Sequence, residues 1–204
     1  SIAVGPTDIP IARAVGVLLE GPGGEATAST IIWQIRVPRV LAAVLIGAGL
    51  ALAGAVMQSV LNNPLGSPYT LGISHAAMFG AALSIVALGA GKITVGGGLG
   101  ITFANPYLVT IAAFLASLSS AGVILALAKY RGASPETMIL TGIALGSLFT
   151  AGTTAMQYFA SQNDLASIVF WSFGDVGRAT WRNLGILAVV LVPSTVYFLR
   201  HSWK

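Results

Sequence analysis

Two arginines, Arg36 and Arg39 in the stretch "RVPR", precede a long uncharged segment. Their guanidinium groups could anchor a helix by reaching lipid headgroups, or could bind carboxylates through two parallel hydrogen bonds. Pro38 is typical of the first turn of a helix, which would place both arginines at a helix N-terminus. Cations there oppose the helix dipole, so a carboxylate on a docking partner is a second interpretation beside anchoring.

A second set of polar residues recurs at spacings of 3, 4, 3 and 4, which is one face of a helix. Such a stripe in a membrane helix either bonds to its own backbone and its neighbours or lines a wet passage. The amide of Gln157 is harder to satisfy on its own helix than a hydroxyl, which favours the passage. The stripe consists of Ser147, Thr150, Thr154, Gln157 and Ser161.

The sequence offers no set of residues for catalysis or metal binding. It contains no cysteine, and its two histidines, His75 and His201, are far apart. The stretch "ALGAGKIT" fails as a phosphate-binding loop, because that motif requires glycine where Val86 stands and serine or threonine where Ile93 stands. We therefore expect no enzymatic activity, no metal and no cofactor in this chain, and we assign no role to His75.

Composition predicts that these residues lie on membrane helices. Hydrophobic residues make up 55% of the chain and charged residues 8%, against roughly 25% charged residues in soluble domains. A fifth apolar run, Leu184–Leu199, is short for a span, which takes about 17–25 residues. The expected fold is therefore an all-α polytopic transmembrane bundle with about five spans. The four longer runs are Val40–Leu61, Ile73–Ala90, Leu108–Ala128 and Thr137–Ala160.

The remaining segments are predicted to lie outside the membrane core. Residues 1–35 are mildly amphipathic and are interpreted as an external segment with a short helix, ahead of a membrane domain over 36–204. A short helix is expected near Asp164–Trp171, with Asp164 as its N-cap. No acidic or basic residue falls inside a predicted span core, which argues against a proton-coupled carrier.

The ordered set of motifs resembles the FecCD family of ABC importer permeases. The resemblance is carried by "RVPRVLAAVLIGAGLALAGAVMQSVLNNPLGSPYTLGIS" and by the downstream "WSFG" element. It implies a full subunit of about ten spans, of which this chain is an internal piece. It further implies a homodimeric permease in the inner or plasma membrane of a prokaryote, working with an external substrate-binding protein and two ATPase subunits that hold ATP and magnesium.

The resemblance also implies roles for individual residues. Arg36 and Arg39 would face outside and pair with glutamates of the binding protein, although a count of basic residues alone would place them in the cytoplasm. The polar stripe would line the passage. The cytoplasmic gate would include Asn63, Leu65, Ser134 and Pro135.

The cargo is left open by the sequence. An iron–siderophore complex is the first expectation by family frequency, and haem and cobalamin follow. An ion-coupled secondary transporter or a membrane-embedded enzyme would be the alternatives. The first would need inverted repeats and buried charge, and the second a catalytic constellation; neither is visible.

Overall fold

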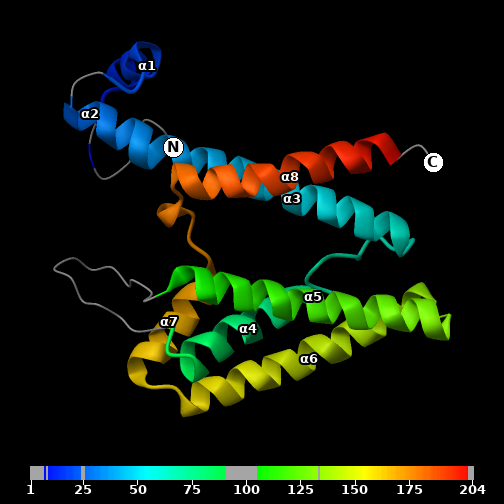
Figure 1. The fold of residues 1–204 in the computed structure, drawn as a ribbon. Helices are drawn as coiled ribbons and strands as arrows, with labels where there is room; N and C mark the ends of the chain where they lie inside the picture. The colour runs from blue at the N-terminus through cyan, green and yellow to red at the C-terminus, as the bar shows by residue number, and fades with distance from the viewer. Residues whose placement is uncertain (1–6, 8, 24–25, 91–104, 133, 202–204) are drawn as a thin grey trace. The chain divides into compact units, whose positions relative to one another are not determined.

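The computed structural model describes residues 7, 9–23, 26–90, 105–132 and 134–201. Within these ranges the chain forms helices and no strand, which confirms the all-α prediction (Figure 1). It divides into two compact units, one made of residues 1–52 and 175–204 and the other of residues 53–174. The two units are described separately below.

The first unit contains α1 (Ile11–Glu20), α2 (Ala26–Thr30), a π-helical turn (Ile31–Arg36) and the first half of α3 (Val37–Val60). Its second chain segment adds a 3₁₀ turn (Val176–Arg178) and α8 (Trp181–His201). A small apolar cluster holds α1 against the π-helical turn. The buried residues of this cluster are Ile9, Ala14, Val17, Ile32 and Val37.

The helix that carries the two arginines begins earlier than the sequence suggested. It runs without a break from Thr27 to Val60, so Arg36 and Arg39 lie well inside it and not at its N-terminus. The π-helical turn explains how Pro38 is tolerated, because there the amide of Val37 bonds to the carbonyl of Ile32, five residues back. A proline lacks the amide hydrogen that an α-helical turn requires, and a widened turn accommodates that loss. The helix-dipole argument for a carboxylate partner is therefore wrong.

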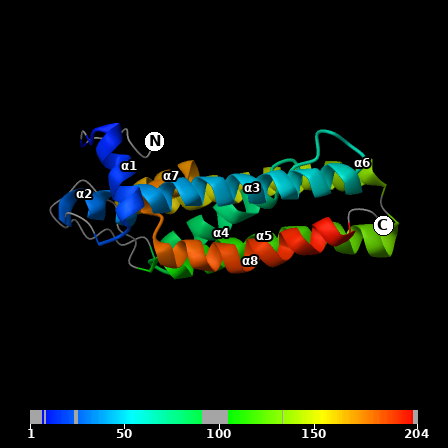
Figure 2. The same ribbon diagram turned by 90° about the horizontal axis from the view of Figure 1, so that it is seen from above.

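The second unit contains the end of α3, then α4 (Ile73–Ala87), α5 (Pro106–Arg131), α6 (Pro135–Phe159) and α7 (Gln162–Phe173). Helix α4 packs against α5, α6 and α7, and both views show it between α5 and α6 (Figures 1 and 2). Small residues allow this close packing, as is usual for helices in lipid. The buried core around α4 consists of Ala81, Ala82, Ile85, Ala90, Val109, Ala113 and Ile168.

Four helices are long and apolar enough to cross a membrane, namely Thr27–Val60, Tyr107–Arg131, Pro135–Phe159 and Trp181–His201. Two length predictions need correction. Helix α4 is only 15 residues long, about 22 Å at 1.5 Å per residue, whereas the run expected to be borderline extends to 21 residues in α8. Within an 18-residue apolar stretch of each long helix, only 6% to 17% of the residues are buried, so the apolar faces require lipid or partner subunits.

Candidate functional site

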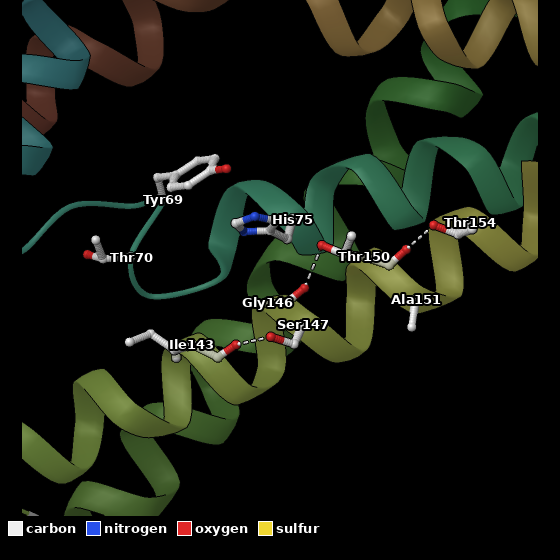
Figure 3. Close-up of a pocket in the computed structure, with 10 residues that line it drawn as sticks. Tyr69, Thr70, His75, Ile143, Gly146, Ser147, Thr150, Ala151 and Thr154 are labelled. Atoms are coloured by element: carbon white, nitrogen blue, oxygen red, sulfur yellow. Dashed lines mark hydrogen bonds between the residues drawn. The ribbon is translucent and has the colours of Figure 1, made fainter.

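Three of the five residues of the predicted polar stripe, Ser147, Thr150 and Thr154, line a pocket in the second unit, and Gln157 and Ser161 do not. The pocket has a volume of about 520 Å³ and lies between α6 and the loop that leads into α4 (Figure 3). Gly142 and Gly146 of α6 allow this loop to come close, because a methyl group added at Gly142 would lie 2.6 Å from the Cα atom of Leu71. The pocket is lined by Tyr69, Thr70, His75, Gly142, Ile143, Gly146, Ser147, Thr150, Ala151 and Thr154.

The hydroxyl groups of the stripe donate to their own helix. Ser147 Oγ donates to the carbonyl of Ile143 at 3.0 Å, and Thr150 Oγ1 donates to that of Gly146 at 2.8 Å. Thr154 Oγ1 donates in the same way to the carbonyl of Thr150 at 3.0 Å (Figure 3). Each hydroxyl oxygen keeps its lone pairs, so this wall can accept hydrogen bonds from a guest.

The stripe is shorter than the spacing predicted. Gln157 lies half-buried in the last turn of α6, and α6 ends at Phe159. Ser161 therefore does not continue this helix. Its hydroxyl instead accepts from the amide of Asp164 at 3.2 Å and donates to the carboxylate of Asp164 at 2.7 Å. The short helix itself is confirmed, but its N-cap is Ser161 and not Asp164.

His75 lines the pocket, although the sequence reasoning assigned it no role. It lies in the first turn of α4, with the Tyr69 ring 4.4 Å from its own, centroid to centroid, at a tilt of 50° (Figure 3). Its Nδ1 atom packs on Gly146, where an added methyl group would lie only 3.2 Å away. The spacing of Gly142 and Gly146, four apart on the striped helix, was the signal that another segment packs there.

The two arginines differ in their environments. Arg36 is buried, with 7% of its surface exposed, and its Nη2 donates to the carbonyl of Thr7 at 2.7 Å. Arg39 is exposed, and its Nε donates to the carbonyl of Gly177 at 3.0 Å. Of these two arginines, only Arg39 has an exposed side chain, while Arg36 bonds Thr7 to the helix.

The predicted gate residues lie at turns around helix ends. Asn63 Oδ1 accepts from the amide of Leu65 at 2.8 Å, which closes a turn and leaves Leu65 76% exposed. Ser134 is the N-cap of α6, with its hydroxyl accepting from the amide of Thr137, and Pro135 is the first residue of that helix. All four residues lie in a turn or at the start of a helix, and their role as a gate stays a prediction.

Among the described residues no group of three or more histidine, cysteine, aspartate or glutamate side chains could hold a metal ion. Charged residues also lie near the ends of the long helices of the second unit, such as Lys129 and Arg131 at the end of α5. The described part of this unit is therefore an apolar helical body with a pocket lined by small, hydroxyl and aromatic side chains.

The profile of the FecCD transport family matches residues 1–204, the whole of the sequence. The chain belongs to the FecCD transport family. Two relatives support this placement. A protein of Methanocaldococcus jannaschii described as an ABC transporter permease, MJ0087, is 48% identical over 203 residues, covering 100% of this chain and 57% of that protein. The vitamin B12 import system permease protein BtuC of Serratia proteamaculans is 34% identical over 168 residues, covering 82% of this chain and 46% of that protein.

A solved structure shares the arrangement of helices. It is described as an inward-facing conformation of a metal-chelate type ABC transporter, and it matches with a TM-score of 0.78 at 26% sequence identity. The match covers 99% of this FecCD chain and 57% of that one. The chain thus spans about half the length of the relatives it matches.

Proposed function

We propose that this chain is part of the membrane-spanning subunit of an ATP-binding-cassette importer. The observation that carries the proposal is the match of the FecCD family to the entire sequence. The long apolar helices support it, because few of their residues are buried and their apolar faces need lipid or partner subunits. ATP hydrolysis then belongs to two separate ATPase subunits, and this chain performs no chemistry of its own.

The polar wall of α6 borders the passage in this proposal. Its hydroxyl groups are satisfied by their own helix, so the wall is stable whether it faces lipid, water or cargo. The wall is nevertheless open on one side, where Ser147 and Thr154 are exposed. A second copy of the subunit, related by a two-fold axis, would close the passage over this open side.

Docking of the external binding protein depends mainly on Arg39. Its guanidinium is exposed and held in place through Nε, which suits it to bind a carboxylate of the partner. Arg36 contributes indirectly, because it fixes Thr7 against the same helix. The docking face is outside the cell, and the turns at Asn63 and Ser134 belong to the cytoplasmic gate.

The cargo proposed first is an iron–siderophore complex or a related metal chelate. The matched structure is of a metal-chelate type transporter, which supports the class. Cobalamin is the second candidate, because several relatives at 34% identity are named as vitamin B12 import permeases. Haem is the third. All three are bulky and carry their metal inside an organic ligand.

An ion-coupled secondary transporter is the rival mechanism. Such carriers place ionisable side chains near the middle of the membrane. In the described helices α5 and α6, charged residues are confined to the helix ends, at Lys129, Arg131 and Glu136. This arrangement favours an energy source outside the chain.

The test is reconstitution of the full-length permease with its ATPase subunits and binding protein in liposomes. Uptake of radiolabelled cyanocobalamin and of a ferric hydroxamate is measured with ATP, with a non-hydrolysable analogue, and with an imposed proton gradient. We expect one of the two chelates to be taken up, and only when ATP is present. Uptake driven by the gradient in the absence of ATP would overturn the importer mechanism.

A further inference from the structure

The pocket next to α4 offers more hydrogen-bond acceptors than donors. The hydroxyl hydrogens of Ser147, Thr150 and Thr154 are used by carbonyls of α6. The hydroxyl of Thr70 is likewise bonded within its own turn, to the carbonyls of Leu65 and Ser67. None of these four hydroxyls has a hydrogen left for a guest. Those of Ser147, Thr150 and Thr154 offer lone pairs, whereas the oxygen of Thr70 already accepts from the amide of Ser67 at 2.9 Å.

His75 supplies a donor, and the structure indicates which nitrogen carries it. Its Nδ1 atom is buried and has no hydrogen-bond partner. A proton on Nδ1 would be a buried N–H without an acceptor, which loses its hydration and gains nothing in return. A ring that carries one hydrogen therefore keeps it on Nε2, and His75 also lines the pocket. The Tyr69 ring, packed against the imidazole, holds its orientation.

The same arrangement argues against metal ligation by His75. A histidine that binds a metal through Nε2 has its hydrogen on Nδ1, and almost always donates that hydrogen to a carboxylate, a carbonyl or water. No such acceptor is bonded to Nδ1 here. Ligation through Nε2 would create the buried unpaired N–H that the resting ring avoids.

We propose that this pocket binds the oxygen-bearing rim of a metal chelate whose metal is already fully coordinated. His75 Nε2–H donates to a carbonyl, carboxylate or hydroxamate oxygen of the cargo, and the hydroxyls of Ser147, Thr150 and Thr154 accept from its amide or hydroxyl hydrogens. The inference rests on the proposed transport function and narrows its substrate class. The cargo passes this point without exchanging a ligand on its metal.

The first test reads the tautomer directly and needs neither cargo nor ATP. The full-length permease is labelled with ¹⁵N-histidine in lipid nanodiscs, and the His75 signals are assigned by their loss in His75→Gln. We expect a protonated Nε2 and a bare Nδ1. A ring with its hydrogen on Nδ1 would overturn the inference while leaving the importer function intact.

The second test separates hydrogen bonding from ligation and from simple packing. Gln can replace the Nε2–H donor, whereas Leu fills a similar space without a donor. We expect His75→Leu to raise the half-saturating chelate concentration about tenfold, the loss of roughly one good hydrogen bond, and His75→Gln to stay within about threefold. Tyr69→Phe is the control for the phenol hydroxyl of Tyr69, because it keeps the ring that packs on the imidazole, and it should have the smaller effect.

Three outcomes would contradict the role of His75 as a donor, and a fourth would contradict the proposed function instead. If His75→Gln transports as poorly as His75→Leu, the imidazole is needed for more than its N–H. If His75→Leu transports like the wild type, the donor has no role. A change in the visible spectrum of the bound chelate that depends on His75 would indicate ligation. If the wild type takes up neither chelate while the tautomer is as expected, it is the proposed function that fails.

Discussion

Gly80 lies in the middle of α4, where the backbone of α5 comes closest. A methyl group at this position would lie 2.5 Å from the carbonyl oxygen of Ala112 and 2.7 Å from the Cβ atom of Ala116. Ordinary van der Waals contact begins at 3.4 Å, so the substitution Gly80→Ala requires nearly an ångström of separation. Neither atom belongs to a flexible side chain, and the two helices must therefore move apart.

The expected free-energy change has two opposing parts. Overpacking of a tight core costs about 1–3 kcal/mol, and a clash with backbone atoms belongs near the upper end. Alanine offsets up to about 1 kcal/mol, because it is a better helix former than glycine. We therefore expect Gly80→Ala to lower the free energy of unfolding by about 2 kcal/mol.

The matched control is Gly122→Ala in α5. Gly122 is exposed in the middle of its helix, and an added methyl group there meets no atom within 4 Å. This variant should be unchanged or more stable by up to about 1 kcal/mol. Equilibrium unfolding of the full-length permease in lipid–detergent micelles measures both. If Gly80→Ala proves as stable as Gly122→Ala, α4 and α5 do not approach as described, and the packing argument is refuted.

Further predictions concern the two arginines, the N-cap of α7 and the contact between His75 and α6. Arg39→Glu should weaken docking of the binding protein at least tenfold in a pull-down or surface plasmon resonance assay, without loss of folded permease, since Arg39 is exposed. Arg36→Glu should instead lower the stability of the permease, because the buried guanidinium donates a hydrogen bond to a backbone carbonyl. Ser161→Ala removes the N-cap of α7 and should cost about 1 kcal/mol, seen as faster hydrogen exchange confined to that helix. Gly146→Ala should displace the imidazole of His75, because the new methyl group would lie 3.2 Å from Nδ1, and the His75 NMR signals report this shift.

The outcomes that would contradict these predictions are equally specific. If the binding protein docks with equal affinity to Arg39→Glu and to the wild type, Arg39 does not serve docking, and its anchoring in the headgroup layer becomes the better explanation. Exchange in α7 that is unaffected by Ser161→Ala would mean that the cap contributes nothing to that helix. Unchanged His75 signals in Gly146→Ala would mean that the ring does not pack on α6.

Much of the fold follows from composition, because a nearly uncharged chain in lipid has few options. Apolar runs of sufficient length predicted α3, α5 and α6. The error at Pro38 has a physical cause. Proline is equally compatible with a first turn and with a widened turn inside a helix, and the sequence does not distinguish the two.

Only part of the site could be predicted from the sequence, for a similar reason. Helical spacing brought Ser147, Thr150 and Thr154 to one face, as the structure confirms. The spacing continued to Ser161 by coincidence, since a helix end is fixed by capping and not by periodicity. The contact of His75 with α6 could not be predicted from its own segment, because Gly146, on which its ring packs, lies about seventy residues away in the sequence.

A passage for bulky cargo has to satisfy two requirements that oppose each other. Its wall must be polar enough to interact with the cargo, yet it must not leave unpaired donors facing lipid when the cargo is absent. The hydroxyls of α6 meet both requirements, because each donates to the carbonyl four residues earlier and keeps only acceptor capacity free. In the proposed importer, such a wall would hold amide-bearing or hydroxyl-bearing cargo weakly at several points. The donor proposed at His75 would then orient the cargo at one place along α6.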